Sequence, residues 1–327
     1  MIKTAIAIIA YFLFFLFILP DAFRFGECWH TFYWDGPWVS QRIADAGFKT
    51  LVDDFFTQFL ATRWSASLML SLGMALASWL LYSCVSKWDR RGWCFFAVLT
   101  VGMGGFSLWL SHQRAYQDVE GRFRNQMMLV HDGQWEEIIE QSSGRIVNNL
   151  LEQNLRNMAL AETDQLDTRL MEQPCQNIYS IYVQDIQSLY VAAMLSDIYW
   201  SMGHVAFSQQ YAFQTNEKMG NVSPRLLQRL ADCAIIYGQY ELAAKYLWWL
   251  DHTLFYRDWS RQRRVLLWDD EAVNAHPELG QLRRCLIAEN RFSGSRGLDK
   301  DLQCIIDQCP EHRQTQQYLN ALLKLYY

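Results

Sequence analysis

The chain has 327 residues, of which 51% are hydrophobic, 15% aromatic and only 19% charged, and its formal net charge is −5. This length allows about two domains of ~150 residues each. The negative charge argues against a nucleic-acid partner, because phosphate groups attract a basic protein surface. The scarcity of charged residues argues against an ordinary soluble enzyme.

The first long apolar run covers about residues 4–20 and reads TAIAIIAYFLFFLFIL from Thr4 to Leu19, after Lys3. A cleaved signal peptide also has a basic start and an apolar core, but its cleavage site needs small residues. Here the run ends in LPDAF, directly after bulky Phe and Leu. We therefore predict an uncleaved membrane anchor, with a cleaved signal peptide as the alternative.

Two further uncharged runs, about residues 64–86 and 92–111, are separated only by the basic turn KWDRRG. Each run has the ~20 residues that a helix needs to cross a bilayer, so the two predict a transmembrane hairpin. Short basic loops stay on the cytoplasmic side of a membrane. The sequence thus predicts a multi-pass inner-membrane protein with a cytoplasmic N-terminus, a periplasmic C-terminal domain and contacts to membrane lipids.

The segment 21–63 between the first two runs is aromatic and amphipathic, and it contains FGECWHTFYWDGPW at residues 25–38. Trp and Tyr favour the headgroup layer of a membrane, so we interpret this stretch as an interfacial aromatic belt. The alternative is a stacking site for a lipid-linked sugar or a lipid headgroup, formed by Trp29, His30, Asp35 and Trp38. The residues predicted to lie at the membrane interface are Trp29, Tyr33, Trp34 and Trp38.

From residue 115 onward, apolar residues recur at intervals of three and four, which is typical of helices. Three glycines, Gly133, Gly203 and Gly238, follow predicted helices at separations of 70 and 35 residues. This period resembles the tetratricopeptide repeat over about residues 115–255. Ser208 and Arg169 depart from the pattern, because a small Ala is usual there, and the unit NMALAETDQLDTRLM has no turn glycine. A plain helical bundle is the alternative.

Three stretches carry a wider resemblance: DDFFTQF at 53–59, NNLLEQNLRNMAL at 148–160 and RLLQRLADCAIIYGQYELAAKYLWWL at 225–250. In these stretches the chain resembles an uncharacterised Bacteroidota family of multi-pass membrane proteins of unknown function, with tetratricopeptide-like C-terminal regions. The resemblance implies architecture and location. It implies no chemistry, because the family has no assigned activity.

The sequence contains no motif with a catalytic or metal-binding spacing. H-E-x-x-H, paired C-x-x-C, a Walker loop and G-x-S-x-G are all missing from it. We therefore predict no enzyme activity, no metal and no cofactor, and leave open whether a small molecule binds. Most cysteines are expected to be free and buried, although a bridge from Cys285 to Cys304 or Cys309 is possible.

The predicted fold is all-α. Three transmembrane helices, one anchor plus a hairpin, form a membrane domain over residues 1–112, and a tetratricopeptide-like array forms an extracytoplasmic domain over residues 113–327. Such an array favours a membrane-anchored scaffold that presents a groove to a partner protein in the cell envelope. The alternative is an accessory protein or enzyme that handles a lipid-linked sugar or lipid through residues 25–38. The residues predicted to bind the partner are Gln187, Tyr190, Asp197, Gln228 and Asp232.

Overall fold

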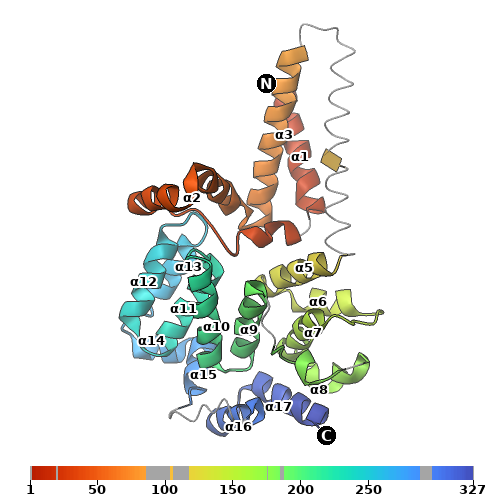
Figure 1. The fold of residues 1–327 in the computed structure, drawn as a ribbon, viewed down its shortest axis with the longest axis vertical. Helices are drawn as coiled ribbons and strands as arrows, with labels where there is room; N and C mark the ends of the chain where they lie inside the picture. Colours follow the sequence, from red (N-terminus) through yellow and green to blue (C-terminus); the bar gives the residue numbers. More distant parts are fainter. Residues whose placement is uncertain are drawn as a thin grey trace.

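A computed structural model of the chain describes residues 2–19, 21–85, 104–105, 118–174, 176–184, 188–287 and 297–326. All regular structure within these ranges is helical, which confirms the predicted all-α class. Two N-terminal helices, α1 and α3, extend away from a larger helical domain that contains the C-terminus (Figure 1). The predicted domain boundary at residues 112 and 113 lies outside the described residues.

The N-terminal part consists of α1 (Ile2–Ile18), α2 (Gly36–Thr57) and α3 (Arg63–Val85), with the short 3₁₀ helices η1 (Asp21–Gly26) and η2 (Gln58–Leu60). Helices α1 and α3 pack through Phe15, Ala66 and Leu19, which directly follows α1. Asp35 caps α2 by accepting a hydrogen bond from the backbone N–H of Trp38, and Gly47, with φ of 84°, kinks this helix.

No helix in the described part of the chain combines the length and the apolar character needed to span a membrane. Helix α1 has only 17 residues, against the ~20 that a span requires. Helix α3 has 23 residues, with Arg63 and several serines among its apolar side chains. The predicted three-span membrane domain is therefore wrong, and so is the inner-membrane location inferred from it. Most of the third predicted span, and the basic turn at 87–91, lie outside the described residues.

The larger domain begins with four helix pairs. They are α5 (Val119–His131) with α6 (Trp135–Ser142), α7 (Leu150–Glu162) with α8 (Leu166–Arg169), α9 (Leu189–Ser201) with α10 (Val205–Lys218), and α11 (Pro224–Ile236) with α12 (Tyr240–Asp251). Helix α7 packs against both α5 and α9, and α10 packs against α11. The remaining elements are η3 (Leu170–Glu172), η4 (Ile178–Ser180), α13 (Arg257–Arg264), α14 (Asp270–Ala275), α15 (Pro277–Arg284), α16 (Leu298–Gln308) and α17 (Arg313–Tyr326).

The same turn joins the two helices of each pair. Gly133, Gly203 and Gly238 have φ values of 68°, 76° and 69°, in the left-handed region that glycine adopts without strain. In the second pair this position is occupied by Asp164, with φ of 57°. The residue after each of these four donates its backbone N–H to the carbonyl five residues earlier, at 2.7–2.8 Å. The unit that lacked a turn glycine is thus built like the others.

Serine replaces the expected alanine where α9 and α10 approach each other. Ser196 donates its hydroxyl to the carbonyl of Ser208 at 2.9 Å, and Ser208 donates its own to the carbonyl of Ser196 at 2.8 Å. Both side chains are fully buried. Because serine is nearly as small as alanine and its hydroxyl is satisfied here, this departure from the repeat pattern leaves the close packing intact.

Residues 24–34, which we call the crossing segment, run from η1 across the ends of array helices toward α2 (Figure 1). The carbonyl of Cys28 accepts a hydrogen bond from the hydroxyl of Ser223 at 2.7 Å, and the hydroxyl of Tyr33 donates to the carbonyl of Val222 at 3.1 Å. The backbone N–H of Trp34 donates to the carbonyl of His252 at 2.6 Å. The crossing segment therefore joins the N-terminal helices to α11 and α12.

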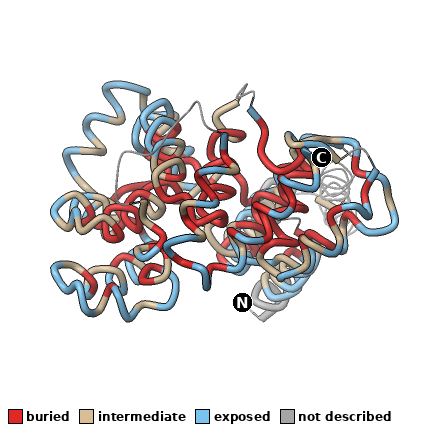
Figure 2. Tube along the Cα trace, turned by 90° about the horizontal axis from the view of Figure 1, so that it is seen from below, coloured by how far each residue is buried: buried red, intermediate tan, exposed pale blue. Residues whose placement is uncertain are grey.

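Helix α17 covers the opposite edge of the array, where the inter-helix turns lie. The amide of Gln317 accepts from the N–H of Leu166 at 2.9 Å and donates to Asp164 at 2.9 Å. The hydroxyl of Thr315 donates to the carbonyl of Met202 at 2.8 Å. Buried residues are concentrated in the centre of the molecule, and exposed ones on its outer helices and loops (Figure 2). The array is thus held at both edges by chain segments distant in sequence.

Replacing Gly238 by Val is expected to lower the free energy of unfolding by about 1–2 kcal/mol, because a β-branched residue is strained at positive φ. The added Cβ would have ordinary contact with Arg283, at 3.6 Å, so the cost is conformational. Urea denaturation measures the change. Gly36→Ala, at a position with open space and no positive φ, is the control and should change stability by less than about 0.5 kcal/mol. Equal stability of the Gly238 variant and the wild type would contradict the turn assignment.

Candidate functional site

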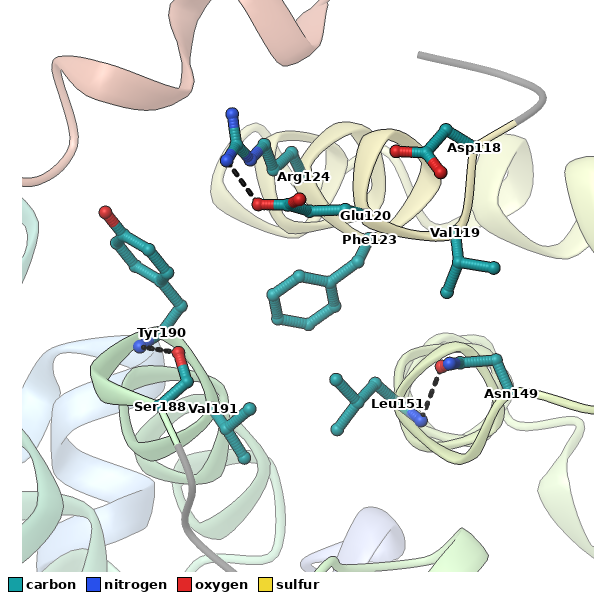
Figure 3. A pocket seen from close by; sticks show the side chains of 10 residues that line it. All are labelled: Asp118, Val119, Glu120, Phe123, Arg124, Asn149, Leu151, Ser188, Tyr190 and Val191. Carbon is teal, nitrogen blue, oxygen red and sulfur yellow. Dashed lines mark hydrogen bonds and ion pairs between the residues drawn. The ribbon is translucent and has the colours of Figure 1, made fainter. Parts of the chain in front are cut away.

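A pocket of about 390 Å³ lies where the first turns of α5, α7 and α9 meet (Figure 3). Phe123, Leu151 and Val191 extend into the space between the three helices, so the interior is apolar. These helices are the first members of three successive pairs. The lining consists of Asp118, Val119, Glu120, Phe123, Arg124, Asn149, Leu151, Ser188, Tyr190 and Val191.

Two of the three helix starts at this pocket have their backbone N–H groups capped. The side-chain oxygen of Asn149 accepts from the N–H groups of Leu151 and Glu152, at 2.9 and 3.1 Å. The hydroxyl of Ser188 accepts from the N–H of Tyr190 at 3.2 Å. Capped N–H groups are no longer free to hold an anion. The pocket is therefore better suited to an apolar group than to a phosphate.

The rim of the pocket is polar and slightly acidic. Asp118 and Glu120 are exposed there, and Arg124 pairs with Glu120 across one turn of α5. The guanidinium of Arg124 also lies 5.6 Å from the ring centroid of Phe25. The rim thus has two carboxylates and one guanidinium. A complementary ligand would place a positive charge beside its apolar group.

One predicted partner-binding residue, Tyr190, lines this pocket. Its ring centroid lies 5.0 Å from those of both Phe25 and Trp29, so the crossing segment forms the wall behind it. Gln228 is half-buried on α11 and does not line the pocket. Gln187 lies outside the described residues.

The predicted partner-binding residues Asp197 and Asp232 are buried, although they were expected to face a groove. Asp197 accepts from Arg225 at 2.6 Å and from Arg229 at 3.0 Å. Asp232 accepts from Arg263 at 2.7 Å, and its burial raises its pKa to about 6 although Arg263 opposes this shift. A buried carboxylate needs such a partner. These two residues hold α9, α11 and α13 together and are not accessible to a ligand.

The aromatic residues predicted to lie at a membrane interface have different environments. Trp29 and Tyr33 are each only 1% exposed and belong to the core of the helical domain. Trp34 is 51% exposed, and Trp38 is half-buried with its ring centroid 5.3 Å from that of Tyr33. Trp29 and Tyr33 therefore form neither an interfacial belt nor an open stacking surface, because array residues cover them.

Glu27, in the crossing segment, is a buried carboxyl group beside this core. Its side chain is buried, Oε2 accepts from the hydroxyl of Tyr256 at 2.5 Å, and Oε1 has no hydrogen-bond partner among the described residues. Burial raises the pKa of Glu27 to about 8, although the bond from Tyr256 and the charge of Arg24 lower it. Glu27 is therefore mostly protonated at neutral pH.

The other reactive groups are arranged for packing. Burial raises the pKa of the Cys28 and Cys233 thiols to about 12, so neither forms the thiolate that a nucleophile or metal ligand needs. Cys285, Cys304 and Cys309 are free thiols in the structure. Burial and the charge of Arg225 lower the pKa of His131. No group of three metal-ligating side chains occurs in the described ranges.

Sequence reasoning missed most of the pocket, including Val119, Phe123, Asn149 and Val191. Asn149 and Ser188 each precede a periodic apolar run, which is a recognisable N-cap signal, so two of the helix starts could have been located. The packing of α5, α7 and α9 decides whether these helix starts meet in space. A single sequence does not show which face of each helix contacts its neighbours, so it could not predict the pocket.

Comparison with known proteins gives a family and no activity. A sequence-family model described as "Family of unknown function (DUF6057)" matches residues 1–117 and 124–325, so the chain belongs to this family. No curated protein and no solved structure matches the chain.

Glu27→Gln is expected to change how stability depends on pH. Between about pH 4.5 and pH 8, folded Glu27 keeps its proton and the unfolded side chain loses it. The folded state then binds more protons, so this residue makes the free energy of unfolding fall with rising pH, by about 1.4 kcal/mol per unit. Glutamine does not titrate and preserves the acceptor for Tyr256.

Urea denaturation of both proteins from pH 5 to pH 8.5 measures this effect. The variant should gain stability relative to the wild type as the pH rises through this range. Glu241→Gln, at an exposed position on α12, is the control and should follow the wild type. Parallel stability curves for Glu27→Gln and the wild type would show that the carboxyl is ionised in the folded protein.

Proposed function

We propose that this member of the DUF6057 family is a helical-repeat interaction protein that binds a segment of a partner protein. The observation that carries the proposal is the apolar pocket formed by the first helices of three successive pairs. In solenoid arrays, stacked repeats create an extended binding surface from such helices. The finer resemblance, to tetratricopeptide arrays, is part of the proposal and is supported by the shared turn at residues 133, 164, 203 and 238.

The chemistry of the pocket favours an apolar anchor side chain on the partner. Its volume of about 390 Å³ lies within the ~300–1,000 Å³ range of ligand pockets. Binding energy at protein interfaces is concentrated in apolar anchors that fill such pockets and are surrounded by a polar rim. Asp118 and Glu120 on the rim favour a partner segment with a basic residue next to the anchor.

The alternative function, handling of a sugar or lipid by aromatic stacking on residues 25–38, has less support. Stacking needs an accessible ring face, and Trp29 and Tyr33 are each 1% exposed. The raised pKa values of Cys28 and Cys233 likewise favour binding over nucleophilic catalysis. We therefore propose a role without catalysis.

The test is selection of peptides from a random display library on the intact chain. Enriched peptides should contain an aromatic or large aliphatic residue next to Lys or Arg. Val119 is 47% exposed at the pocket mouth, and Val119→Lys should weaken these peptides about tenfold or more, because the ammonium lies beside the apolar anchor and repels the adjacent Lys or Arg. The position is exposed and lies between Asp118 and Glu120, so this variant should fold.

Val265→Lys is the matched control, because it makes the same change at a valine that is 71% exposed at the end of α13. Peptides should bind this variant as they bind the wild type. Failure to enrich any peptide, or equal binding to both variants, would reject the pocket as the recognition site.

A further inference from the structure

A second pocket, of about 380 Å³, is lined by arginines from three separate elements. Arg145 belongs to the loop after α6, Arg156 to α7 and Arg169 to the end of α8. Glu172, from η3, provides a carboxylate in the same lining. No residue is shared with the lining of the apolar pocket, so this is a separate site.

The carboxylates at this pocket are each shared between two arginines. Glu172 accepts from Arg156 at 3.0 Å and from Arg169 at 2.9 Å. Arg145 pairs with Glu152 at 2.6 Å, and Glu152 also pairs with Arg122 at 2.9 Å. Since one carboxylate neutralises only one guanidinium, positive charge is in excess around the pocket.

Arg156 carries this excess charge in a buried position. Its side chain is only 2% exposed, and Glu172, its carboxylate partner, is 47% exposed. Burial lowers the pKa of Arg156, the charge of Glu172 raises it, and the charge of Arg169 lowers it again. A buried guanidinium that is incompletely neutralised is stabilised by any further anion that reaches it.

The walls of this pocket are fixed by hydrogen bonds from Gln173. The side-chain amide of Gln173 accepts from the N–H of Val147 at 2.9 Å and donates to the carbonyl of Arg145 at 3.0 Å. These bonds join the loop after α6 to the segment after η3. The arginines therefore converge on a preformed space and need little reorganisation to bind a ligand.

We propose that this pocket binds a phosphate group as a dianion. With Arg122 and Glu152 just outside the lining, four guanidinium groups and two carboxylates leave two positive charges around the pocket. A phosphate monoester carries a charge of about −1.5 to −2 at neutral pH. Arg145, Arg156 and Arg169 each bond protein acceptors through two of their three side-chain nitrogens. The third nitrogen of each guanidinium can therefore donate to a phosphate oxygen. This proposal does not depend on the peptide-binding function.

The test is isothermal titration of the full chain with inorganic phosphate, at an ionic strength held constant with chloride. The wild type should show saturable binding at one site, and sulfate should compete for it because sulfate is also a tetrahedral dianion. Acetate, a planar monoanion, should bind at least about tenfold more weakly. Binding of acetate that is as tight as that of phosphate would overturn the assignment to a dianion.

Arg169→Gln is expected to weaken phosphate binding about tenfold or more, because it removes one charged donor. Glu172 then remains to neutralise Arg156, and Arg169 is already 30% exposed, so the fold should persist. Circular dichroism checks this, and Arg145→Gln provides a second variant at the pocket. The matched control is Arg261→Gln, at a guanidinium that is 65% exposed on α13. The proposal fails if the wild type shows no saturable binding, or if the pocket and control variants bind phosphate equally.

Discussion

The structure depends on the burial of the crossing segment, a largely non-helical stretch of chain inside a helical protein. Water cannot satisfy polar groups there, so the array must supply their partners. The hydroxyl of Ser223 donates to the carbonyl of Cys28, and the hydroxyl of Tyr256 donates to the carboxyl of Glu27. The carbonyl of His252 accepts from the N–H of Trp34. Arg24 completes the junction by pairing with Asp132 at 2.7 Å and donating to the carbonyl of Ala61 at 2.8 Å. The helices before and after this segment are therefore coupled through a buried polar network.

The helical class and the turns of the array could be predicted from the sequence, because both are local properties. Apolar spacing indicates a helix, and a glycine after an apolar run indicates a left-handed turn. Asp164 was missed because a non-glycine residue at positive φ is uncommon, and its support comes from Gln317, far along the chain. The first two apolar runs did form helices, but α1 is shorter than a span and α3 carries Arg63 and several serines, so the prediction of membrane spans failed.

The candidate site could be predicted only in part, because it depends on contacts distant in sequence. Tyr190 was identified from its helix position and does line the apolar pocket. Asp197 and Asp232 occupy similar positions, but arginines from neighbouring helices cover them, and helix phase alone does not reveal such a partner. Likewise, the aromatic residues of 25–38 were predicted to lie at a surface. Their buried contacts come from residues near 190, 222 and 249, which are distant in sequence.

The central claim, that the crossing segment is an integral part of the helical domain, can be tested by amide hydrogen exchange measured by mass spectrometry on the intact chain. The N–H of Trp34 bonds the carbonyl of His252, and that of Trp29 bonds the carbonyl of Gly26. Buried, hydrogen-bonded amides exchange only when the structure around them opens. Peptides that cover residues 26–35 should therefore contain amides that exchange as slowly as those of α11. Fast exchange of residues 26–35, with α11 still protected, would contradict the account.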